Sequence, residues 1–79
     1  NLESMNKLGK LYEKDGNGTE AMEWYQKAEE KGDVTAMINL GDMYKDAAGW
    51  RKDNARYYYE EAAAKGSEIA KQRLANLEK

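Results

Sequence analysis

The sequence predicts an all-α protein built as an array of helical repeats, and two recurring phrases support that prediction. Residues 5–12, Met-Asn-Lys-Leu-Gly-Lys-Leu-Tyr, return 32 positions later as residues 37–44, Met-Ile-Asn-Leu-Gly-Asp-Met-Tyr. Residues 24–32, which contain Trp-Tyr-Gln-Lys-Ala and end in Lys-Gly, return 34 positions later as residues 58–66. Two phrases that recur in the same order at this period are typical of stacked helical hairpins.

The 79 residues are expected to form a single domain with three parts. Residues 1–32 form the first predicted hairpin and residues 33–66 the second, and residues 67–79 form a capping helix with a polar outer surface. No segment shows sustained alternation of apolar and polar residues, so no strand is expected.

Each expected helix carries apolar residues three and four positions apart and begins near a residue that can cap it. Asn1, Asp33 and Ser67 are the expected caps of the first, third and fifth helices, and Thr19 and Asp53 those of the second and fourth. The predicted helices cover residues 2–14, 20–31, 34–46 and 54–65, and a fifth begins at residue 68. Leu11 and Ile69 are among the residues expected to face the core.

Four glycines have predicted structural roles. Gly32 and Gly66 follow a lysine at expected helix ends, where a left-handed residue is common. Gly9 and Gly41 lie inside helices, where glycine costs about 1 kcal/mol relative to alanine. We therefore expect another backbone to approach them closely, with small residues on the partner helix and aromatic side chains filling the wedges between hairpins.

The composition argues against several classes of function. Without cysteine or histidine the chain has no thiolate ligand and lacks the commonest general base and metal ligand, so neither an enzyme nor a metal or cofactor site is expected. A net charge of −2 with interspersed signs gives no basic stripe for nucleic acid. Apolar runs are too short to cross a membrane. The chain is expected to be a monomer, and its compartment stays open.

Two acidic patterns favour ordinary structure over chemistry. Residues 13–19 are similar to the start of an EF-hand calcium loop, but Trp24 stands where that loop needs a bidentate glutamate. A glycine-rich turn is the better interpretation. The pairs Glu29–Glu30 and Glu60–Glu61 are expected to lie on solvated helix faces.

The repeated residues resemble the tetratricopeptide repeat. The first copy joins a Met-x2-Leu-Gly-x2-Tyr motif starting at Met5 to Ala21, Tyr25 and Ala28, and the second copy starts at Met37. The phrase at residues 24–32 is more similar to the related Sel1-like repeat. Methionine replaces the usual tryptophan, and a glycine replaces the usual proline between repeats. The resemblance covers essentially the whole chain and implies a right-handed α-α superhelix that binds a peptide or protein without catalysis.

The resemblance also implies a candidate site, because the first helix of each hairpin lines the concave side of such an array. Asparagines there can hydrogen-bond a peptide backbone, and Lys10 with Arg73 can hold a carboxylate. An ordinary solvated helix face is the alternative interpretation. The predicted peptide-binding residues are Asn6, Lys10, Asn39, Asp42, Arg73 and Asn76.

The leading functional hypothesis is a protein–protein interaction scaffold that binds a peptide or a partner helix in its concave groove. The alternative is an engineered or designed helical-repeat scaffold without a natural ligand, which the joint absence of Pro, Cys, His and Phe also fits. Trp50 lies in the longest expected loop, either as an anchor packed on the hairpin or as an exposed contact residue.

Overall fold

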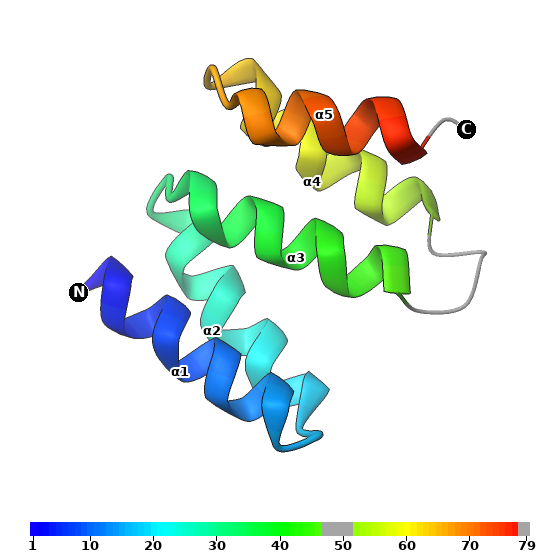
Figure 1. The fold of residues 1–79 in the computed structure, drawn as a ribbon. Helices are drawn as coiled ribbons and strands as arrows, with labels where there is room; N and C mark the ends of the chain where they lie inside the picture. The colour runs from blue at the N-terminus through cyan, green and yellow to red at the C-terminus, as the bar shows by residue number, and fades with distance from the viewer. Residues whose placement is uncertain (47–51, 78–79) are drawn as a thin grey trace.

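The computed structural model describes residues 1–46 and 52–77, which form five α-helices and contain no strand. This confirms the predicted all-α class and the number of helices. The chain runs back and forth, and each helix packs mainly on the helices before and after it in sequence (Figure 1). The helices are α1 (Leu2–Lys14), α2 (Gly18–Glu30), α3 (Val34–Asp46), α4 (Lys52–Ala64) and α5 (Glu68–Leu77).

Three of the five predicted N-caps are confirmed. The side chains of Asn1, Asp33 and Ser67 each accept a hydrogen bond from the backbone N–H three residues ahead, at 3.1, 2.9 and 3.1 Å. Each bond satisfies one of the N–H groups that have no partner within the first helical turn. The sequence thus locates the starts of α1, α3 and α5.

The other two predicted caps are wrong. Helix α2 begins at Gly18, so Thr19 already lies inside its first turn, and the Asn17 side chain at the N-cap position makes no capping hydrogen bond. Helix α4 begins at Lys52, which places Asp53 inside the first turn as well. A carboxylate at this end of a helix is still favourable, because the backbone dipoles are positive there.

The turns after α2 and α4 have the left-handed glycine that the sequence predicts. Gly32 has a φ angle of 87° and Gly66 of 96°. At the first of these turns the N–H of Gly32 donates to the carbonyl of Glu29 at 2.8 Å, and that of Asp33 to the carbonyl of Ala28 at 3.1 Å. This pair of bonds is the Schellman arrangement, which reverses the chain within a few residues.

The helical glycines are covered by tyrosine rings, which corrects the expected close approach of backbones. A Cβ at Gly9 would lie 2.7 Å from Cδ1 of Tyr25, and one at Gly41 would lie 2.7 Å from Cδ1 of Tyr59. Both tyrosines are fully buried. They lie inside each hairpin and not in a wedge between hairpins, because the missing side chain leaves space for a ring.

The core otherwise consists largely of small and medium side chains, and two residues expected in it are exposed. Leu11 is 58% exposed and Ile69 55%, and each lies at the edge of the apolar stripe of its helix. Trp50 lies outside the described residues. The buried hydrophobic residues are Ala21, Tyr25, Ala28, Ala36, Met37, Leu40, Ala55, Tyr59, Ala62, Ala70 and Leu77.

Candidate functional site

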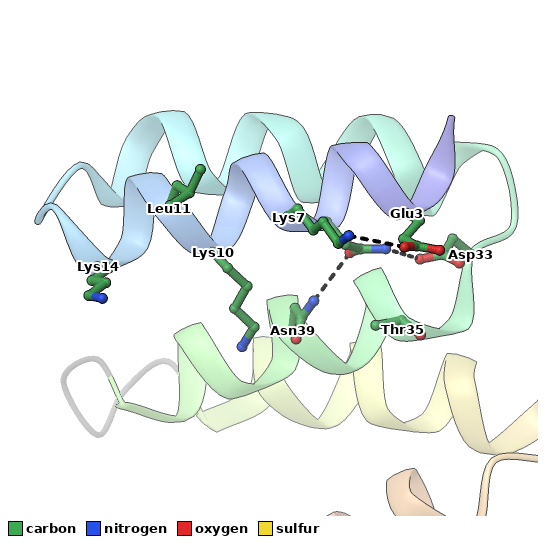
Figure 2. Close-up of a pocket in the computed structure, with 9 residues that line it drawn as sticks. Glu3, Lys7, Lys10, Leu11, Lys14, Asp33, Thr35 and Asn39 are labelled. Atoms are coloured by element: carbon green, nitrogen blue, oxygen red, sulfur yellow. Dashed lines mark hydrogen bonds and ion pairs between the residues drawn. The ribbon is translucent and has the colours of Figure 1, made fainter.

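A cavity of about 690 Å³ lies between α1 and the first turns of α3 (Figure 2). Three of the six predicted peptide-binding residues, Asn6, Lys10 and Asn39, line it. The sequence therefore identifies the helix faces that form the cavity, although only half of the predicted set lies there. The full lining consists of Glu3, Asn6, Lys7, Lys10, Leu11, Lys14, Asp33, Thr35 and Asn39.

A chain of hydrogen bonds fixes the polar part of this lining. The Nδ2 group of Asn6 donates to Oδ2 of Asp33 at 2.6 Å and to the carbonyl of Leu2 at 3.1 Å. Its Oδ1 accepts from Nδ2 of Asn39 at 3.2 Å. Both side-chain N–H groups of Asn6 are thus engaged, which leaves Asn39 as the asparagine with hydrogen-bonding groups to spare.

Asp33 has a second role that its sequence position alone does not show. The same Oδ2 that accepts from Asn6 also accepts the capping bond from the backbone N–H of Ala36 at 2.9 Å. One carboxylate therefore ties α1 to the start of α3. Sequence reasoning identifies the cap but misses the contact with Asn6, because the two residues are 27 positions apart.

Lysines form the other part of the lining. Lys7 pairs with Glu3 at 3.1 Å, and both side chains are largely exposed, so the pair contributes little to stability. Lys10 and Lys14 form no ion pair with any described residue. The exposed Leu11 lies beside them. Lys14 and Leu11 are not among the predicted site residues, although the spacing of residues 7, 10, 11 and 14 places them along one side of a helix.

Asp42 and Arg73 lie outside this cavity and bind each other. Nε of Arg73 is 2.9 Å from Oδ1 of Asp42, and the Tyr59 hydroxyl donates to the same oxygen. The group joins α3, α4 and α5. Arg73 is therefore neutralised by a neighbour and not held ready beside Lys10. Asn76 is exposed on α5, also outside the cavity.

The Tyr25 hydroxyl makes the corresponding contact in the first hairpin, donating to Oε1 of Glu13 at 2.8 Å. Burial of the phenol, the hydrogen bond to Glu13 and the negative charges of Glu13 and Asp42 raise the pKa of Tyr25 above its ordinary value of 10.0. The phenol therefore stays protonated and acts as a donor that holds Glu13. The partner of Tyr59 is Asp42 on α3. Asp42 is not at the repeat position that corresponds to Glu13 on α1.

The acidic pairs are not all solvated, which corrects the expectation for Glu29 and Glu61. Both are only partly exposed, and Oε1 of Glu61 is shielded from solvent. Burial, a hydrogen bond to Glu61 and the negative charges of Glu61 and Glu30 raise the pKa of Glu29 above its ordinary value of 4.5. The two carboxyl groups thus meet between α2 and α4, and the Glu29 carboxyl keeps its proton more readily than that of an isolated glutamate.

Residues 1–46 and 52–77 contain no group of three or more metal-ligating side chains placed to hold an ion. None of their helices is both long and apolar enough to cross a membrane.

Comparison with known protein families finds no match to this chain, and comparison with curated proteins finds no similar sequence.

Proposed function

We propose that the chain is a protein–protein interaction scaffold of the tetratricopeptide or Sel1-like kind. Its two hairpins and capping helix form a right-handed superhelical array, with α1, α3 and α5 along the concave side. The order of the helices, their packing on sequence neighbours and the repeated phrases support this arrangement. A peptide or a partner helix binds between α1 and α3.

The observation that carries the proposal is the cavity between these two helices. Its volume, about 690 Å³, lies within the range of about 300–1,000 Å³ that is common for binding pockets. Asn6 and Asn39 are already fixed by hydrogen bonds to each other and to Asp33. A ligand therefore meets a lining that loses little conformational entropy on binding.

The hydrogen bonds divide the asparagines into two roles. Asn6 uses both of its N–H groups inside the protein, so it is a positioning residue for Asn39 and Asp33. Asn39 uses one N–H toward Asn6, and its second N–H and its carbonyl oxygen are available to a peptide backbone. Only 7% of Asn39 is exposed, so its amide offers a ligand in the cavity a donor and an acceptor that are fixed in place.

The proposal is tested by titrating isotopically labelled protein with a peptide library, with blocked and free carboxyl ends, and following amide chemical shifts. We expect shifts at Asn6, Lys10 and Asn39 and weaker binding in Lys10→Ala. Lys31→Ala is the matched control, because it removes an exposed lysine outside the cavity. A library in which no peptide shifts any cavity residue would overturn the proposal.

A further inference from the structure

We infer that the cavity selects a short acidic segment that carries one apolar side chain. This inference rests on the proposed function and specifies the chemistry of its ligand. Three observations support it: the unpaired lysines of α1, the engaged state of nearby carboxylates, and the exposed Leu11 between the lysines.

The lysines give the cavity a charge opposite to that of the chain. Lys7, Lys10 and Lys14 lie three and four positions apart on α1 and all line the cavity. Lys7 is neutralised by Glu3, whereas Lys10 and Lys14 form no ion pair with the described residues. The whole chain has a net charge of −2. A local excess of positive charge on an acidic protein favours anionic partners and speeds their association.

Two carboxylates in this region accept hydrogen bonds from other donors. Asp33 accepts from Asn6 and from the backbone N–H of Ala36. Glu13, which lies on α1 between Lys10 and Lys14 in sequence, accepts from the Tyr25 hydroxyl at 2.8 Å. These bonds keep both acids oriented toward the protein and leave the lysines to an external carboxylate.

Leu11 supplies the apolar contact. It is 58% exposed, although a large aliphatic residue on an amphipathic helix normally faces the core. It lines the cavity together with the lysines, whose methylene groups extend the apolar surface around it. A ligand with an apolar side chain among its acids would therefore bury Leu11 while its carboxylates reach the ammonium groups.

The test uses end-blocked synthetic peptides, so that no terminal carboxylate takes part. The probe has a central leucine flanked by glutamates. One comparison peptide has lysines in place of the glutamates, and another has serine in place of the leucine. Binding is measured by chemical-shift titration of the labelled full chain at low and high salt. We expect the acidic probe to shift the amide resonances of Lys10, Leu11 and Lys14, and to bind at least fivefold more tightly than either comparison peptide. Its binding should weaken at high salt.

Matched variants separate this site from a general charge effect. We expect the double variant Lys10→Gln/Lys14→Gln to weaken binding of the acidic probe about fivefold or more. The control Lys31→Gln/Lys65→Gln has the same net charge, changes exposed lysines outside the cavity, and is expected to bind as the parent does. Glu3→Gln frees Lys7 and is expected to strengthen binding.

The outcomes distinguish this inference from the function on which it rests. If the basic or serine peptide shifts the cavity residues as strongly as the acidic probe, the acidic and apolar selectivity is wrong while the scaffold function stands. Equal loss of binding in both double variants also overturns the inference, since it assigns the effect to net charge. If no peptide shifts a cavity residue, both the inference and the proposed function fail.

Discussion

Two tyrosine rings determine where glycine is required in this protein. Gly9 and Gly41 stand at equivalent places in the two copies of the repeated phrase, and each is covered by the ring of a fully buried tyrosine, Tyr25 or Tyr59. Glycine is unfavourable inside a helix, yet here its missing side chain is what allows the ring to pack. The usual gain from replacing a helical glycine by alanine should therefore reverse sign.

We predict that Gly9→Ala and Gly41→Ala each lower the free energy of unfolding by about 1–3 kcal/mol, the usual cost of overpacking a core. Gly18→Ala is the control, because its Cβ would lie 3.7 Å from Cε of Met43, an ordinary contact. It should be neutral or stabilising by up to about 1 kcal/mol. Urea denaturation measures all three. If Gly9→Ala stabilises the protein as much as Gly18→Ala does, the ring contact does not constrain the position.

At this scale the sequence predicts part of the candidate site. Periodicity assigns Asn6 and Asn39 to the polar faces of their helices, but it does not predict the hydrogen bond between them, because a periodic pattern does not show which side chains meet. The same limit explains the other misses. Arg73 has Asp42 as a partner on another helix, and Leu11 lies at the edge of a stripe that periodicity assigns to the core.

The helices themselves differ in how firmly their starts are fixed. Asp33 caps α3 and also holds Asn6, Ser67 caps α5 alone, and Thr19 lies within the first turn of α2. Sequence reasoning treats all three as equal caps, because each has a side-chain oxygen before an apolar run. It cannot distinguish them, since a short loop can place the helix start one or two residues earlier.

We therefore expect a graded series of losses when these residues are replaced by alanine. Ser67→Ala should cost about 1 kcal/mol, as a lost cap usually does. Asp33→Ala should cost about 2 kcal/mol, because it also leaves a partly buried amide of Asn6 without its acceptor. Thr19→Ala should stay within about 0.5 kcal/mol of the parent. The measurement is urea denaturation, and equal costs for all three would contradict the assigned roles.

Helices α2 and α4 meet at the carboxyl groups of Glu29 and Glu61, which repel each other when both are charged. Since the pKa of Glu29 is raised in the folded protein, folding favours its protonated form. The folded state then binds more protons than the unfolded state above the ordinary value of 4.5, so stability falls as the pH rises from 4.5 through the folded pKa.

We predict that Glu29→Gln flattens this decline and raises the free energy of unfolding at neutral pH by roughly 0.5 kcal/mol, as expected for a partly exposed pair of like charges. Glu60→Gln is the control, since Glu60 is exposed on α4 beside Glu61. Denaturation curves recorded from acidic to neutral pH give the comparison. A parent protein whose stability rises over this range, or a Glu60→Gln variant that behaves like Glu29→Gln, would refute the assignment to Glu29.

Across the whole molecule, each helix is stabilised mainly by packing on the helices next to it in sequence. The main contacts join α1 to α2, α2 to α3, α3 to α4 and α4 to α5. The inner helices therefore pack on both sides and the outer helices on one. The order of these elements is predictable from the sequence because the repeat fixes it. The starts of three helices follow from cap chemistry, and the ends of α2 and α4 follow from their glycines. The relation of one hairpin to the next depends on long-range contacts such as Asn6–Asp33.

We expect native-state hydrogen exchange to follow this arrangement. Amides of α3 should exchange most slowly, and those of α1 and α5 fastest among the five helices, because an end helix can open without breaking the rest. Nuclear magnetic resonance at neutral pH resolves the individual amides. Protection that is equal in all five helices would show that the chain opens only as one cooperative unit.

The ring-on-glycine contact has a consequence for how separate copies of the chain interact. In the repeated phrase, the position of Gly9 and Gly41 corresponds to Ala75 on α5, which is exposed. Its methyl group would occupy the space that a tyrosine ring takes on α1 and α3. We therefore expect the second helix of another copy, which carries Tyr25 or Tyr59, to fit less closely on α5 than it does within its own hairpin. On this expectation, one methyl group disfavours end-to-end exchange of hairpins between copies and growth into a fibre.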